Sequence, residues 1–382
     1  MVAPSEHVTA PASRPRARDL GICPGLLPTG PLNAITDVAG VRVGHTTLIH
    51  GAGPLVPGIG PVRTGVTAII PHDGDIFHDK LTAAVVRING FGEVTNSEQV
   101  HEMGVIEGPL MLTNTQNVPR VADAVIDWMF DHYPGMGVTG WGISPLVAET
   151  HDGLLNDIRG RHVHKEHVYH AIETASASPV EEGAVGGGTG MICYEFKGGI
   201  GTSSRRLAPE QGGYMVGVLV QSNFGWRSRL RIDGVPVGRE LEHYVEGIER
   251  ETDGSIIVVV ATDAPMTHRQ LTRLGMRATH GMAHTGSFGG NTSGDFAIAF
   301  STTRRRHSPS ASHTFNLEQV VEDSLLINLL FAAVAEATEE AILNSLFKAT
   351  TMTGRDNLVV PALPIAETVE IMHRYGHHAV HE

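Results

Sequence analysis

The sequence is poor in cysteine and basic residues and has no long apolar runs. Cys23 and Cys193 are its only cysteines, and they form no Cys-x-x-Cys pair, so neither a disulfide framework nor a zinc knuckle is indicated. Lys and Arg number 28 against 41 Asp and Glu, a formal net charge of -13, which argues against binding to nucleic acid or anionic membranes. No apolar run approaches membrane-spanning length. We therefore expect reduced thiols and a cytoplasmic location.

The remaining composition is that of a globular protein. Hydrophobic residues make up 41% and charged residues 18% of 382 positions, with 45 Gly and 21 Pro, so many tight turns should connect short elements. This length fits two domains or one large layered domain. Residues 1–18 mix Pro, Ser, His and Arg without an apolar segment, which predicts a disordered tail rather than a signal peptide.

The order of predicted elements indicates stacked sheets. Strands are expected over residues 41–45, 65–70, 81–88, 213–221, 256–261 and 296–300. Helices are expected after Thr115, over residues 161–176, after Thr267 and over residues 320–349, and a mobile excursion over residues 302–314. Strands and helices do not alternate strictly, which favours sheets covered by helices over a doubly wound parallel sheet.

One junction could carry chemistry. Gly254-Ser255 leads into the apolar, β-branched residues 256–261, a pattern typical of a strand buried on both faces. If the Gly254-Ser255 bond were cut, Ser255 would carry both a hydroxyl nucleophile and an α-amine able to act as its base. Asp-Gly-Ser is also common turn chemistry, and these residues alone favour a turn.

Four further side chains stand at predicted strand ends. Asn223 could donate to an oxyanion, Ser293 and Asp295 could orient the Ser255 amine, and Glu149 could bind a substrate ammonium. Each also has a structural interpretation, as a turn, a strand entry or a surface acid. Taken singly, the structural interpretation is favoured for every one of them.

Two other patterns also have a functional interpretation. Residues 186–190 are Gly-rich, but no Gly-Lys-Ser/Thr follows, so a tight turn is favoured over a phosphate loop. His164 and His167 could chelate a metal, although a solvated helix face is favoured because His-Glu-x-x-His spacing is absent. A metal-dependent hydrolase is therefore the alternative from a different enzyme class, beside a non-catalytic binding protein.

In combination these motifs resemble the self-processing aminopeptidases that include the L-aminopeptidase D-amidase/D-esterase and the β-peptidyl aminopeptidases. The resemblance runs in order through RDLGI (18–22), NAITDV (33–38), EGPL (107–110), LTNT (112–115), VAET (147–150), GGTGMICYEFKGG (187–199), Gly254-Ser255 and Ser293-Gly294. It implies an α+β fold, a four-layered αββα sandwich of N-terminal-nucleophile-hydrolase type. It also implies self-cleavage into an α chain, residues 19–254, and a β chain, residues 255–382, which form one layered domain and assemble as a homo-oligomer of αβ pairs.

The resemblance assigns roles to the motif residues. Ser255 resembles the nucleophile, Asn223 the oxyanion donor, Ser293 a partner of the catalytic amine and Glu149 the acid that holds the substrate's amino group. Asp295 stands where the family commonly has Glu, and His151 where the L-aminopeptidase branch has Tyr. The implied substrates are small peptides, amides or esters with a free amino terminus, without metal or cofactor. A β-aminopeptidase and an ω-amino acid oligomer amidase of the same architecture remain alternatives.

Overall fold

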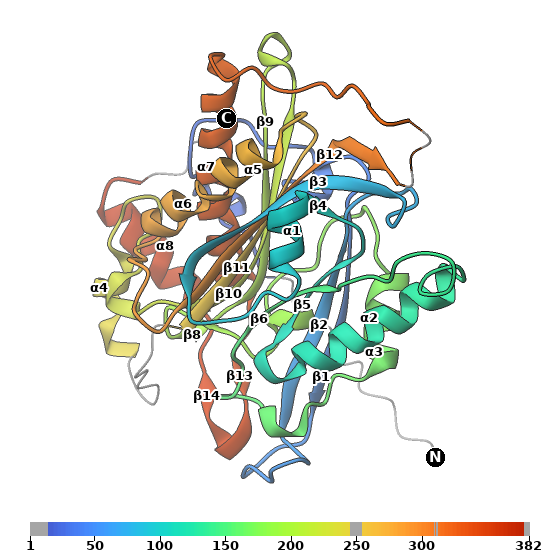
Figure 1. The fold of residues 1–382 in the computed structure, drawn as a ribbon. Coiled ribbons are helices and arrows are strands. Elements are labelled where there is room, and N and C mark those ends of the chain that lie inside the picture. Colours follow the sequence, from blue (N-terminus) through green and yellow to red (C-terminus); the bar gives the residue numbers. More distant parts are fainter. Residues whose placement is uncertain (1–13, 245–253, 309, 311, 378–382) are drawn as a thin grey trace, which may run out of the picture.

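The computed structural model describes residues 14–244, 254–308, 310 and 312–377. Thr252 and Asp253, which precede the predicted cleavage bond, lie outside the described residues. Two β-sheets form the centre of the molecule, and helices cover the outer face of each (Figure 1). The chain therefore adopts the α+β, four-layered αββα sandwich expected from the sequence.

The smaller sheet has four strands. In spatial order they are β1 (Arg42–His50), β2 (Val62–Ile70), β5 (Leu110–Asn114) and β6 (Leu146–Thr150). β5 and β6 pair in parallel, whereas the other neighbours are antiparallel. The carboxyl ends of β5 and β6 consequently meet at one edge of the sheet, and Glu149 lies there.

The larger sheet has six strands and contains both sides of the Gly254-Ser255 junction. In spatial order they are β4 (Val105–Ile106), β3 (Asp79–Gly90), β12 (Gly294–His307), β11 (Gly254–Thr262), β10 (Met215–Phe224) and β9 (Gly199–Arg206). β11 is a central strand, antiparallel to β10 and parallel to β12. The excursion predicted over residues 302–314 is wrong in its first part, because β12 continues to His307 by pairing with β3.

Helices form the two outer layers. On the smaller sheet lie α2 (Val118–His132) and α3 (Lys165–Glu173). On the larger sheet lie α5 (His268–Gly275), α6 (Ala278–His284) and α7 (Leu325–Lys348). The remaining helices are α1 (Ser97–Met103), α4 (Val237–Glu240) and α8 (Ile365–Arg374). Thr267 caps α5 as predicted, through a hydrogen bond from the Gln270 amide. In the described part of the chain no helix is long and apolar enough to cross a membrane.

Three large apolar clusters hold the layers together. One, with Ile69, Leu219 and Ile257, fills the space between the sheets. The second packs α2 and α3 on the smaller sheet, and the third packs α5, α6 and α7 on the larger sheet. Burial of such surfaces is the dominant favourable contribution to folding. Because these clusters cover the strand centres, a substrate can reach side chains only at the strand ends.

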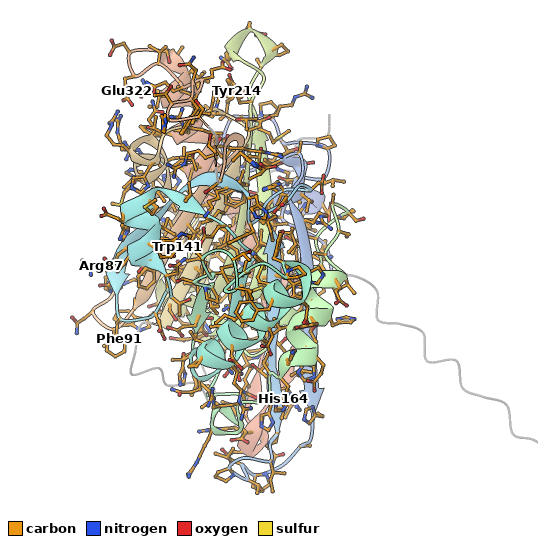
Figure 2. All side chains as sticks on the ribbon, turned by 45° about the vertical axis from the view of Figure 1, so that its right-hand side comes forward. Arg87, Phe91, Trp141, His164, Tyr214 and Glu322 are labelled. Atoms are coloured by element: carbon orange, nitrogen blue, oxygen red, sulfur yellow. The ribbon has the colours of Figure 1, made fainter. Side chains whose placement is uncertain are left out.

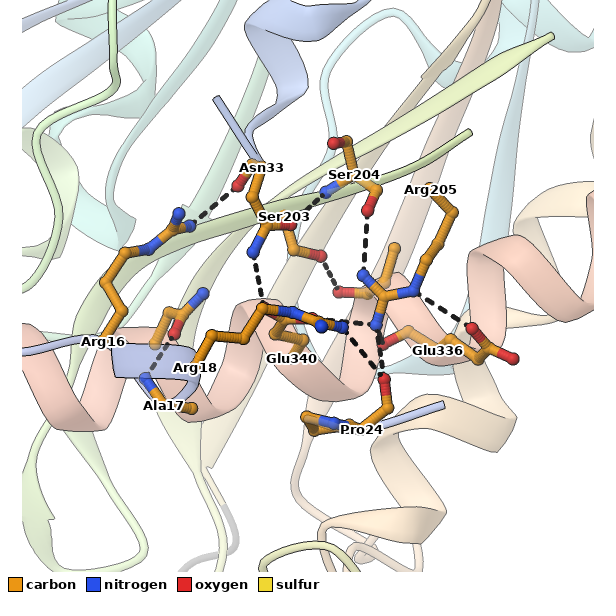
Figure 3. A network of polar contacts seen from close by, with 12 residues as sticks. Arg16, Ala17, Arg18, Pro24, Asn33, Ser203, Ser204, Arg205, Glu336 and Glu340 are labelled. Carbon is orange, nitrogen blue, oxygen red and sulfur yellow. Dashed lines mark hydrogen bonds and ion pairs between the residues drawn. The ribbon is translucent and has the colours of Figure 1, made fainter. Parts of the chain in front are cut away.

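The N-terminal segment is bound to α7 by a buried ion network (Figure 3). Arg18 Nε lies 2.8 Å from Glu340 Oε1, and Arg205 Nη2 lies 2.8 Å from Glu340 Oε2. Arg16 Nε lies 2.8 Å from Glu182 Oε2. The prediction of a disordered tail is therefore wrong for residues 14–18, because Arg16 and Arg18 pair with buried carboxylates and Arg14 donates to the carbonyl oxygens of Phe347 and Leu363. Residues 1–13 lie outside the described residues.

Two short hairpins complete the fold. One joins β7 (Ile192–Cys193) to β8 (Phe196–Lys197), and the other joins β13 (Met352–Thr353) to β14 (Val359–Val360). Cys193 in the first hairpin is buried and Cys23 is exposed, and the two are not joined by a disulfide.

Candidate active site

Strand β11 holds Ser255 at the lip of the core. Ile256, Val258 and Val260 face the helices, whereas Ile257 and Val259 face the other sheet. The prediction that this strand is buried on both faces is confirmed. Ser255 itself is 6% exposed, so its hydroxyl lies at the margin of the core.

Strand register brings the residues predicted on β10 and β12 to Ser255. Asn223 lies directly opposite Ser255 on β10, and Gly294 lies opposite it on β12. Facing residues on antiparallel strands have Cβ atoms about 5 Å apart, so the Asn223 amide is next to the Ser255 hydroxyl. Gly254 lies opposite Phe224 with a φ of 82°, a left-handed conformation that favours glycine.

The Asn223 side chain has a fixed orientation. Its Oδ1 accepts a hydrogen bond from the Ile192 amide at 2.9 Å, and its Nδ2 donates to the His151 carbonyl at 3.0 Å. Because an amide nitrogen carries two hydrogens, the bond to His151 occupies one of them. These contacts hold the amide between the main chains of Ile192 and His151, at the register position opposite Ser255.

Ser293 and Asp295 flank Gly294 and contact each other. Ser293 Oγ donates to Asp295 Oδ1 at 2.6 Å, and both residues are buried. The sequence predicted each of them as a partner of the Ser255 amine. The structure places this bonded pair at the start of β12, where Gly294 pairs with Ser255.

Glu149 reaches the same strand end from the smaller sheet. Its Oε1 accepts from the Glu93 amide at 3.1 Å, and its Oε2 accepts from the Thr115 hydroxyl. A Cβ on Gly92 would lie 3.1 Å from Glu149 Oε1 and 3.2 Å from Gly294 Cα; glycine therefore lets the carboxylate approach the strand that faces Ser255. Burial raises the pKa of Glu149 against the opposing effect of these two hydrogen bonds.

His151 follows Glu149 by two residues, and its main chain makes the contact to Asn223. Its ring nitrogen Nδ1 accepts from the Gly153 amide at 3.3 Å, and the residue is exposed. His151, which was predicted to bind substrate, therefore lies beside the site. Its carbonyl oxygen has a structural role in addition, because it accepts the hydrogen bond from Asn223.

Lys197 is a residue that the sequence analysis missed. Its side chain is completely buried, and Nζ donates to the carbonyl oxygens of Met191 at 2.6 Å and Gly198 at 2.7 Å. Burial lowers the pKa of Lys197 to about 7. These bonds fix the loop whose Ile192 amide holds Asn223. The only signal in the sequence is a charged residue within an otherwise apolar, Gly-rich stretch.

Asp152 was also missed, although it follows the predicted Glu149 and His151. It is buried and accepts hydrogen bonds from Thr64 Oγ1 at 2.6 Å, Asn114 Nδ2 at 2.8 Å and Asn156 Nδ2 at 3.0 Å. Burial raises the pKa of Asp152 to about 6. This carboxylate joins β2, β5 and the loop after β6, and so fixes the edge of the sheet that carries Glu149.

The Gly-rich segment and the His164/His167 pair both have structural roles. A Cβ on Gly187 would lie 2.1 Å from Gln221 Oε1 and 2.8 Å from the Leu112 carbonyl, so the Gly-rich segment is a tight turn packed between the sheets, as favoured. His167 Nδ1 accepts from the His164 amide at 2.9 Å and thereby caps α3. Within the ranges described above, no group of three His, Cys, Asp or Glu side chains is arranged to hold a metal ion.

The chain is similar to known proteins in both sequence and structure. Residues 33–360 match the model of peptidase family S58. A β-peptidyl aminopeptidase of Sphingosinicella microcystinivorans is 47% identical over 380 residues, which cover 96% of this chain and 94% of the relative.

Two solved structures have the same fold. A Pyrococcus horikoshii protein is 48% identical with a TM-score of 0.89, over 95% of this chain and 99% of its own. The L-aminopeptidase D-Ala-esterase/amidase of Ochrobactrum anthropi is 41% identical with a TM-score of 0.87, over the same shares, and is described as a variant of the Ntn hydrolase fold.

Proposed function

The chain belongs to peptidase family S58 and is a serine aminopeptidase of the N-terminal-nucleophile type, and on that premise we propose that Ser255 is its nucleophile after self-cleavage of the Gly254-Ser255 bond. The two products would be an α chain that ends at Gly254 and a β chain that begins at Ser255. Both would remain parts of the same sandwich, because β11 is paired on both sides.

The observation that carries this proposal is the strand register around Ser255. Asn223 faces Ser255 across β10 and β11, and its amide is held by Ile192 and by His151. A nucleophile and an oriented amide donor are the groups that acyl transfer requires. No histidine base is needed, because a free α-amine has a pKa of about 8 and can accept the hydroxyl proton.

In the first reaction the Ser255 hydroxyl attacks the carbonyl carbon of Gly254. The peptide C–N bond breaks as the ester C–O bond forms, and the nitrogen becomes the α-amine of Ser255. Water then hydrolyses the ester and leaves a Gly254 carboxylate. Asn223 donates to the oxyanion in each step.

In the second reaction Ser255 attacks the first amide or ester carbonyl of a substrate with a free amino terminus. Glu149 pairs with the substrate ammonium, which restricts the enzyme to terminal residues. Ser293 and Asp295 hold the Ser255 amine as it accepts the hydroxyl proton and passes it to the leaving group. Water releases the acyl group, and no cofactor takes part.

We further propose that the preferred terminal residue is a β-amino acid. The support is the 47% identity to a β-peptidyl aminopeptidase over 96% of this chain. Comparing the p-nitroanilides of β-alanine and L-alanine tests this preference. A higher kcat/KM for the L-alanine compound would contradict it.

We also propose a cytoplasmic homo-oligomer of αβ pairs. The support for the oligomer is the resemblance to the family, and two strongly exposed apolar side chains, Trp141 at 91% and Phe91 at 69%, are candidate contact residues (Figure 2). Light scattering after size exclusion would give the mass. A single αβ pair at micromolar concentration would contradict the oligomer.

The Ser255→Ala variant tests the proposal. It should remain a single chain without hydrolase activity, whereas Ser178→Ala, at an exposed serine, should cleave itself and act like wild type. A wild-type chain that stays intact while fully active would refute the proposed nucleophile. Undiminished activity in EDTA is expected, and hydrolysis of 6-aminohexanoate oligomers in preference to both p-nitroanilides would favour the ω-amidase alternative.

A further inference from the structure

Two adjoining hollows open beside Ser293 on the larger sheet. The smaller, of about 10 Å³, is lined by Phe224, Trp226 and Ser293 among others, and the larger has a volume of about 540 Å³. They share four lining residues, which are Arg229, Gly286, Ser287 and Phe288. The shared residues place the larger hollow next to the smaller one, whose lining includes Ser293 of the candidate active site.

The larger hollow is basic. Its described lining includes the exposed arginines Arg229, Arg231 and Arg239 and a single acid, Glu242. In the described part of the chain none of the three guanidinium groups forms an ion pair with a carboxylate. Such a cluster is unusual on a chain with a net charge of -13, where most basic side chains could find acidic neighbours.

An aromatic pair orients the arginine nearest to the active site. The rings of Trp226 and Phe288 lie 5.2 Å apart, and the Arg229 guanidinium carbon lies 4.6 Å from the Phe288 centroid and 6.0 Å from that of Trp226. Stacking on a ring leaves the edge of a guanidinium able to donate two parallel hydrogen bonds to a carboxylate. The Arg229 guanidinium can therefore bind an anion where the two hollows adjoin.

We propose that this arginine hollow binds the carboxylate of the substrate's leaving group, so that the enzyme prefers short peptides with a free carboxyl terminus. The inference rests on the proposed function, because it takes Ser255 as the point of attack. Phe224 at the hollow belongs to the helix side of the larger sheet, whereas Glu149 extends from the smaller sheet. The substrate ammonium and the hollow thus lie on opposite sides of the β11 terminus.

This separation assigns the carboxylate to the leaving group. The acyl group of an aminopeptidase substrate is one residue, with its ammonium at Glu149 and its carbonyl carbon at Ser255. What extends past Ser293 is then the part that departs, and in a dipeptide that part ends in a carboxylate. An acidic side chain on the terminal residue is the other possible source of this charge.

The experiment compares β-alanyl-alanine with its amide in wild type, Arg229→Gln and Arg231→Gln. Wild type should favour the free acid in kcat/KM by about fivefold, the effect of one exposed charge pair, through a lower KM. Each variant should bring the ratio close to one, and salt should reduce it in wild type. Arg159→Gln, at an exposed arginine elsewhere, should keep the wild-type ratio.

Each remaining result has a defined meaning. A wild-type ratio of one, or a ratio unchanged in both variants, overturns the inference. A variant that loses discrimination between aspartyl and alanyl p-nitroanilides instead moves the carboxylate to the terminal residue and overturns it too. Arg239→Gln replaces any variant that fails to cleave itself. If wild type hydrolyses neither p-nitroanilide, the proposed function has failed. If it hydrolyses a p-nitroanilide but cleaves β-alanyl-alanine and its amide with equal kcat/KM, the inference alone has failed.

Discussion

Replacing Glu149 by Gln should separate self-cleavage from turnover. The precursor has no ammonium at its scissile bond, so self-cleavage does not need the carboxylate. A substrate does, and Glu149 is 4% exposed, which places the ion pair in a poorly hydrated site. We therefore expect normal α and β chains but impaired hydrolysis.

The size of the effect follows from burial. Removing one partner of a buried, hydrogen-bonded charge pair costs about 2 to 5 kcal/mol, and about 1.4 kcal/mol corresponds to a factor of ten. The loss in kcat/KM should therefore be about 30-fold or more. In wild type both carboxylate oxygens of Glu149 accept a hydrogen bond, one from the Glu93 amide and one from the Thr115 hydroxyl. The side-chain nitrogen of Gln cannot accept a hydrogen bond, so the variant would lose one of these two bonds.

The assay is hydrolysis of β-alanyl p-nitroanilide, with self-cleavage followed by gel electrophoresis. Glu98→Gln is the matched control, because the Glu98 side chain is 95% exposed. Turnover at the wild-type rate by Glu149→Gln would refute the assignment of Glu149 to the ammonium. Equal loss of self-cleavage and turnover would show instead that Glu149 maintains the structure.

Thr115→Val should raise the pKa of Glu149 further, because it removes a hydrogen bond to the charged form. Since Glu149 must be ionised to pair with the ammonium, the acidic limb of kcat/KM should move to higher pH, and an unmoved limb in the pH profile would contradict this. Asn223→Ala should lower kcat about 100-fold or more through loss of the oxyanion donor, and should slow self-cleavage too, with Asn316→Ala at an exposed position as control. A smaller loss in quenched-flow and gel assays would assign the oxyanion to other donors. Lys197→Met should remove a pH dependence of stability: the folded pKa of about 7 lies below the ordinary 10.5, so between these values the unfolded chain binds the extra proton and wild type gains stability as pH rises. Urea unfolding at pH 7 and pH 10 checks this, and equal pH slopes for both proteins would contradict the burial of Lys197.

The sequence predicted the central strand and its neighbours well because their signals are local. Residues 256–261 are β-branched and apolar, and both of their faces are buried. Asn223 and Ser255 each stood at the end of such a run. The family resemblance assigned their roles, but their opposition across β10 and β11 is known only from the structure, because strand register depends on pairing between distant segments.

The parts that sequence could not give depend on long-range partners. Arg16 contacts Glu182, and the Lys197 ammonium is held by carbonyl oxygens within a folded loop. From sequence alone, a charged side chain is predicted to be exposed, because charged residues are rarely buried without a partner. The end of β12 was missed for a similar reason, because Arg305 and Arg306 lie beyond the apolar run of residues 296–300 and are held in the strand by pairing with Leu81 and Lys80.

The most direct test of the central claim is intact mass spectrometry of the purified wild-type protein, with N-terminal sequencing of each fragment. We predict two fragments. The first has 254 residues and ends at Gly254, or is shorter if its N-terminus is trimmed, and the second has the remaining 128 residues and begins at Ser255. A fully active protein whose mass is that of one uncleaved chain, or a fragment that begins at any residue other than Ser255, would contradict the account.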